Sequence, residues 1–90
     1  MLTLVVAAGF ILKISPAQWL AIICAASLVL VSECLNSAIE YLSDQITGEL
    51  NENIKRAKDV AAAAVLVASI AAVIIGLIVF IPALIAMLKV

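Results

Sequence analysis

Four polar side chains recur on one face of the stretch SECLNSAIEYLSD, which runs from residue 32 to residue 44. On a helix that turns about 100° per residue, Glu33, Asn36, Glu40 and Asp44 fall within an arc of about 100° and stack over about 17 Å. These side chains offer oxygen ligands, and the chain has no histidine. Such ligands favour Mg²⁺, which commonly takes one or two carboxylates together with substrate phosphates. The face therefore predicts a cation-dependent site.

Depth along this face suggests a division of roles. Trp19 and Tyr41 are 22 residues apart, about 33 Å on a helix, which matches one bilayer core with an aromatic residue at each interface. This placement puts Glu40 and Asp44 at or beyond one interface, where metal and phosphate are accessible. It puts Glu33 about 10 Å inside that interface, where a carboxylate suits a general base acting on a lipid hydroxyl.

Three structural explanations compete with a functional one: the face could clasp neighbouring helices, end an over-long helix in water, or line a pore. A clasp explains one amide or acid, but three acids on one face repel each other unless cations intervene. A solvated helix end explains Asp44 and Glu40 but not Glu33. Acids inside a membrane are costly and by default mark function, so the cation-dependent site is favoured.

A second polar group follows in the segment KRAKD, where Lys58 and Asp59 stand at the start of the next apolar run. A lysine can hold a nucleotide phosphate as a point charge. The alternative is that these lysines only orient the chain in the membrane. The sequence has no glycine-rich phosphate loop, so a nucleotide would be held by helix ends, lysine and metal.

The elements that position these residues must be membrane helices. The chain has 90 residues, of which 68% are hydrophobic and 12% charged, whereas soluble proteins are about half apolar and a quarter charged. With a net charge of −1 and no long basic run, nucleic acid is not an expected partner. We predict an all-α fold and a single membrane-embedded domain over residues 1–90.

Three apolar segments are expected to span or enter the membrane, at residues 1–14, 17–47 and 54–88. Ser15 and Pro16 form a helix-start signal, Gly48 is a helix stop, and Pro82 is expected to kink the third segment. A span needs about 20 residues. The first segment is shorter, so we expect that residues completing it are missing upstream.

Two further patterns concern orientation and packing. Basic residues gather at positions 55–58, and the positive-inside rule then places the loop 48–57 in the cytoplasm. In the third segment, small residues recur every four positions, at Ala64, Ala68, Ala72 and Gly76. Such a ladder predicts close association of helices, within one chain or between chains.

The motifs ECLNSAIE and RAKDVAAAAVL, at this separation, closely resemble the small prokaryotic integral-membrane lipid kinases, which include bacterial diacylglycerol kinase and undecaprenol kinase. The resemblance covers essentially the whole chain, and the stretches KISPAQW and VIIGLIVFIP look like the undecaprenol kinase branch. It implies three membrane helices per chain in the bacterial inner or plasma membrane, assembled as a homotrimer with composite sites. The implied reaction transfers the γ-phosphate of ATP, with Mg²⁺, to a lipid alcohol such as diacylglycerol or undecaprenol.

The resemblance also assigns roles to residues of this chain. Glu33 matches the catalytic base, and Glu40 matches a metal-binding glutamate. The residues that match the polar set around ATP and metal are Asn36, Asp44, Lys58 and Asp59.

One departure from the family pattern bears on activity. Members begin with an amphipathic surface helix and a polar segment that carries another metal-binding glutamate, whereas this chain starts inside the first span. A truncated sequence and a natural short form both explain this, and without that glutamate we expect weak activity or none. The alternative function is a non-enzymatic small membrane protein, such as a holin-like pore or an assembly partner.

Overall fold

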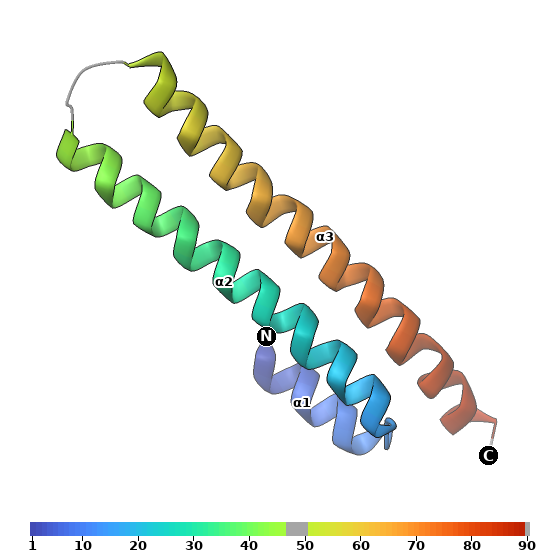
Figure 1. Cartoon of the computed structure of the whole chain (residues 1–90). Helices are drawn as coiled ribbons and strands as arrows, with labels where there is room; N and C mark the ends of the chain where they lie inside the picture. Colours follow the sequence, from blue (N-terminus) through green and yellow to red (C-terminus); the bar gives the residue numbers. More distant parts are fainter. Residues whose placement is uncertain (47–50, 90) are drawn as a thin grey trace.

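The computed structural model describes residues 1–46 and 51–89 as three α-helices, so the predicted all-α fold is confirmed. Their bounds are α1 Leu2–Ile11, α2 Pro16–Ile46 and α3 Glu52–Leu88. Helices α2 and α3 lie side by side as a long antiparallel pair, and α1 runs beside the N-terminal half of α2 (Figure 1). The molecule is a rod measuring 61 × 18 × 17 Å.

Length and composition allow both α2 and α3 to cross a membrane. Their most apolar 18-residue windows have mean hydropathies of 1.9 and 3.1. The core helix of a soluble protein would pass the same test, but it would be mostly buried. Here only 11% and 6% of the two windows are buried within the chain, so the apolar side chains face outward, as lipid contact requires.

The turn between α1 and α2 is built by a helix stop followed directly by a helix start. Lys13 has φ 53, and the amides of Lys13 and Ile14 donate to the carbonyls of Phe10 and Gly9 at 3.3 and 3.2 Å. This is the Schellman arrangement, in which the left-handed position is usually glycine. The bonds satisfy carbonyls at the end of α1 that would otherwise lack partners.

The predicted start of α2 at Ser15 and Pro16 is confirmed. The Ser15 hydroxyl accepts from the Gln18 amide at 3.2 Å, and the Gln18 side-chain oxygen accepts from the Ser15 amide at 2.7 Å. This reciprocal pair is a capping box, and Pro16 occupies the first helical position, where its missing N–H is not needed.

Helix α3 begins earlier than the sequence pattern suggested. Asn51 is its N-cap, and the Asn51 side-chain oxygen accepts from the amides of Asn53 and Ile54 at 2.9 and 3.2 Å. Residues 52–57, expected as part of a loop, are therefore the first turns of α3. The predicted helix stop at Gly48 lies outside the described residues.

Packing of α1 on α2 depends on Gly9. A Cβ atom at this position would lie 2.5 Å from Cη2 of Trp19, closer than van der Waals contact allows. The Phe10 and Trp19 rings are also neighbours, with centroids 5.1 Å apart and planes tilted by 54°. A small cluster of Ile14, Ile22 and Val79 joins the same end of α2 to α3.

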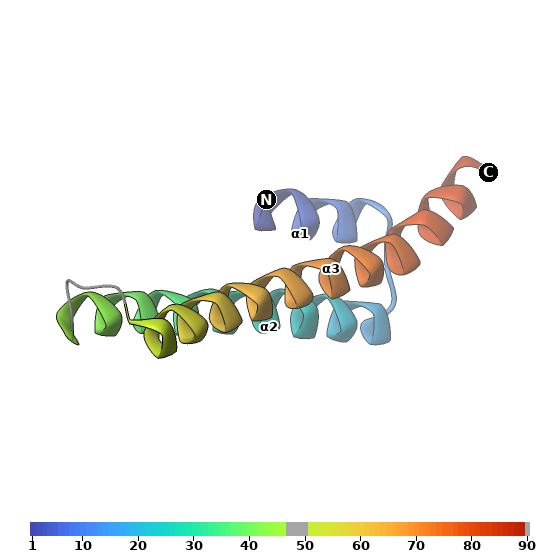
Figure 2. The same ribbon diagram turned by 90° about the horizontal axis from the view of Figure 1, so that it is seen from above.

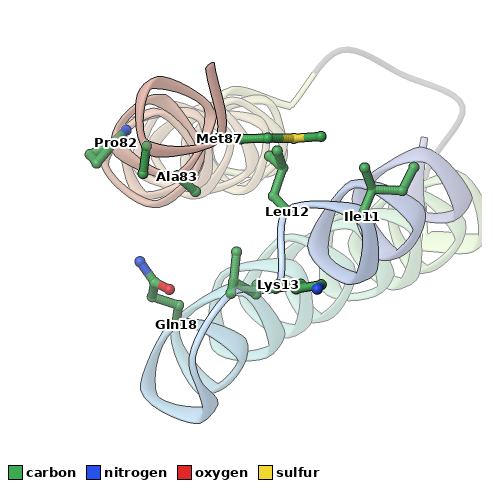
Figure 3. A pocket seen from close by; sticks show the side chains of 9 residues that line it. Ile11, Leu12, Lys13, Gln18, Pro82, Ala83 and Met87 are labelled. Atoms are coloured by element: carbon green, nitrogen blue, oxygen red, sulfur yellow. The ribbon is translucent and has the colours of Figure 1, made fainter. Parts of the chain in front are cut away.

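The C-terminal part of α3 curves away from α2 (Figure 2). Pro82 lies inside this part of the helix, which continues to Leu88; a proline removes one helical hydrogen bond and favours such a bend. A hollow of about 740 Å³ separates this end of α3 from the turn that joins α1 to α2. Figure 3 shows Gln18 on one side of it and Pro82, Ala83 and Met87 on the other.

Candidate functional site

The polar face of α2 is divided between two environments. Ser32, Asn36 and Ile39 are half-buried and Ser43 is buried, so this row faces inward. The side chains of Glu33, Glu40 and Asp44 are exposed. The sequence pattern grouped Asn36 with the three acids, but the structure separates their surroundings.

The inward row satisfies its hydroxyl groups locally. Ser32 donates to the carbonyl of Val29 at 2.8 Å, and Ser43 donates to the carbonyl of Ile39 at 2.7 Å. Asn36 differs, because its Oδ1 atom is buried and has no hydrogen-bond partner among the described residues. A buried acceptor without a partner destabilises a fold by about 1–3 kcal/mol, which suggests that another group binds Asn36.

Glu33 lies at one end of an apolar groove. The groove has a volume of about 420 Å³, is bounded by all three helices, and extends from Glu33 and Leu30 toward Ile22 on α2. On α3 it is lined by Ser69, Ala72, Gly76 and Phe80. It therefore joins a carboxylate to a long apolar surface, an arrangement complementary to a molecule with a polar head and a hydrocarbon chain.

The small-residue ladder of α3 contributes to this groove. Ala68, Ala72 and Gly76 are half-buried, and Ala72 and Gly76 line the groove opposite α2. Ala64, the first member of the ladder, is exposed. The predicted association of helices is thus found within the chain for the later members of the ladder.

Glu40 and Asp44 stand one helical turn apart, about 6 Å along the axis, and both are exposed. Within residues 1–46 and 51–89, no group of three or more His, Cys, Asp or Glu side chains is placed to hold a metal ion. A single chain therefore offers pairs of carboxylates at most. That set still fits Mg²⁺, which commonly takes one or two carboxylates and fills its remaining positions with water and phosphate oxygens.

Lys58 and Asp59 lie in the second turn of α3, at the same end of the helix pair as Asp44. Lys58 is half-buried and Asp59 is exposed. Because Ile22 and Val79 belong to one cluster and the helices are antiparallel, 21 residues further along α2 and 21 residues back along α3 give Ser43 and Lys58. Lys58 and Asp59 are thus level with Glu40 and Asp44, whereas Glu33 lies about 10 Å further along α2 from Glu40.

Three contributions were not anticipated from the sequence. Asn51 caps α3, Gln18 completes the capping box, and Ser69 lines the groove with Glu33. Ser69 carries a recognisable signal, because it is the one polar side chain in the apolar run from residue 60 to residue 88. Asn51 carries the usual signal of an asparagine just before an acidic first turn.

Comparison with known proteins extends these observations. The sequence profile of the family described as prokaryotic diacylglycerol kinase matches residues 1–80. The chain is 40% identical over 76 residues to undecaprenol kinase from Bacillus subtilis, which covers 84% of this chain and 62% of that protein. It is 55% identical over 47 residues to diacylglycerol kinase from Escherichia coli, covering 52% of this chain and 38% of that protein.

A third relative is the diacylglycerol kinase of Synechocystis, which is 45% identical over 62 residues, covering 68% of this chain and 35% of that protein. The chain thus spans less than two thirds of the length of these relatives. No solved structure matches the chain significantly.

Proposed function

The chain belongs to the prokaryotic diacylglycerol kinase family, and from this premise we propose that it transfers the γ-phosphate of ATP to the hydroxyl group of a membrane lipid alcohol. The observation that carries the proposal is the position of Glu33 at the polar end of an apolar groove. Such a groove holds the hydrocarbon chain of a lipid and leaves its head beside the carboxylate.

In the proposed reaction, Glu33 accepts the proton of the lipid hydroxyl as general base. The lipid oxygen then forms a bond to the γ-phosphorus while the bond from that phosphorus to the β–γ bridging oxygen breaks, and ADP leaves. Phosphoryl transfer depends mainly on positioning and on neutralising charge. Both can be supplied by helix ends and side chains of this chain.

The remaining residues hold the nucleotide. Lys58 offers an ammonium group to phosphate, and Asn36 offers a buried oxygen that lacks a partner among the described residues. Asp44 and Asp59 lie at the same end, beside the nucleotide. Glu40 would hold Mg²⁺, with phosphate oxygens as further ligands, and the ion would neutralise charge on the transferring phosphate.

The working form is proposed to be a homotrimer with sites shared between chains. Two features support this: the carboxylates of the described residues form no group large enough to hold a metal, and large apolar side chains are exposed along both long helices. The proposed location is a bacterial inner or plasma membrane, with residues 48–57 on the cytoplasmic side, where ATP is available.

The test is phosphorylation of lipid alcohols by the purified chain in nanodiscs, with ATP and Mg²⁺. We expect transfer to diacylglycerol or undecaprenol, and Glu33→Gln should lower turnover by about 10²–10⁴-fold while nucleotide binding is retained. Glu52→Gln, at an exposed acid in the first turn of α3, is the matched control and should keep normal turnover. Normal turnover in Glu33→Gln would show that Glu33 is not the base, and ion conductance without phosphorylation would favour a pore.

A further inference from the structure

The two glycines of the described helices have different surroundings. An added Cβ atom at Gly9 would collide with Trp19, whereas one at Gly76 would meet nothing within 4 Å outside its own stretch of helix. Neither glycine has a positive φ. Glycine weakens a helix relative to alanine, and close packing explains that weakness only at Gly9. The missing side chain at Gly76 therefore has another effect.

That effect is to widen the apolar groove. Gly76 lines it on α3, between Ala72 one turn before and Phe80 one turn after. Ser69 to Phe80 spans about 16 Å along the helix, and Glu33 and Ser69 mark its polar part. A chain whose head lies beside Glu33 must pass Gly76 before it reaches the Phe80 ring.

The two lipids named for the relatives differ in the shape of their chains. Undecaprenol is a single chain with methyl branches, whereas diacylglycerol carries two chains on one glycerol. The groove is a single channel, so it accommodates one chain along its length. The empty space at Gly76 matches the extra width of a methyl-branched chain, which an unbranched acyl chain does not require.

We propose that Gly76 is a specificity-determining residue, which admits the methyl-branched chain of a prenyl alcohol to the groove beside Glu33. The proposal rests on the proposed function for the role of Glu33, but binding of the chain does not depend on catalysis. A larger side chain at position 76 would fill the channel and exclude methyl branches.

The experiment separates binding from catalysis. A long-chain prenyl alcohol carrying a diazirine is photocrosslinked without ATP to the 90-residue chain in nanodiscs, and the labelled peptides are identified by mass spectrometry. The variants are Gly76→Ala and Gly76→Leu. Ala71→Leu, on the exposed side of α3, is the matched control because it adds the same side chain away from the groove.

We expect labelling of the groove in the wild-type chain and in Ala71→Leu. Gly76→Leu should reduce it by about tenfold or more, with Gly76→Ala between, as expected for overfilling a packed site. In the kinase assay, Gly76→Leu should lower the ratio of prenyl alcohol to diacylglycerol phosphorylation by a similar factor.

The opposite results are equally definite. Undiminished labelling in Gly76→Leu, or equal labelling of the groove by a diazirine-bearing diacylglycerol, would overturn the assignment. A Gly76→Leu variant that changes oligomeric state, measured by native mass spectrometry, would show that the space belongs to a second copy of the chain. If labelling follows the expected order but the wild-type chain transfers no phosphate, the proposed function fails while the binding assignment stands.

Discussion

The two halves of α2 differ in what surrounds them. Residues 16–30 have α1 on one side and α3 on the other, with Trp19 against Gly9 and Ile22 in a cluster with Val79. Residues 31–46 run beyond α1 and lie beside α3 alone (Figure 1). The candidate site residues of α2 all fall in this second half, where three acids are exposed and Asn36 Oδ1 has no partner among the described residues.

The difference separates a packed anchor from a region that is open to binding. Apolar contacts with two helices hold the first half in place, and they leave little room for water or ligand. The second half exposes charges and one unsatisfied amide, which a lipid, a nucleotide or a second chain can satisfy. Changes in the first half should therefore alter stability, whereas changes in the second should alter function.

The largest expected effect on stability tests the anchor. Gly9→Ala adds a methyl group where Trp19 already lies, and we expect the free energy of unfolding to fall by about 2 kcal/mol, since overpacking outweighs the better helix propensity of alanine. Unfolding of the purified protein in detergent micelles measures this change.

The matched control adds the same methyl group at the other glycine. Gly76→Ala meets open space, so its stability should stay equal to that of wild type or rise by at most about 1 kcal/mol. Equal losses for both variants would contradict the close contact between α1 and α2.

The next prediction concerns the open half. Asn36→Leu replaces a buried, unpaired amide oxygen with an apolar side chain of similar size, so we expect the free energy of unfolding to rise by about 1 kcal/mol. Phosphoryl transfer should fall at the same time, because the proposed nucleotide site loses a hydrogen-bonding group. Parallel unfolding and kinase measurements check both effects, and a loss of stability would mean that Asn36 already has a partner in the folded protein.

The smallest effect tests the start of α3. Asn51→Ala removes the oxygen that accepts from the amides of Asn53 and Ile54, and we expect a loss of about 1 kcal/mol confined to the first turn. Hydrogen exchange at those two amides should become faster. Asn53→Ala, next to the cap but without a capping side chain, should leave exchange nearly unchanged; equal acceleration in both would rule out the cap.

Much of the fold could be predicted from local patterns. The Ser15–Pro16 start of α2 was readable because capping depends on residues adjacent in the chain. The start of α3 was placed too late, since the charged residues 52–57 read as loop and the capping signal at Asn51 was not used. Similarly, the acids of α2 were found together because their spacing matches one helical face.

The rest of the site could not be read in this way. Spacing places Asn36 and Glu33 on one broad face, but it does not reveal that α3 covers one edge of that face and leaves the other exposed. The groove that joins Glu33 to Ser69 and Gly76 combines residues more than 35 positions apart in the chain. Their proximity follows from the register of two antiparallel helices.

The amino-acid sequence by itself determined a membrane-embedded, all-α chain with a polar face on its second helix, because composition and helical periodicity are local properties that any environment leaves unchanged. Only the tertiary structure decided which glycine is packed and which is open, and which member of the polar face is buried. Those properties depend on the distance between helices, and that distance is set by side chains that meet across the interface.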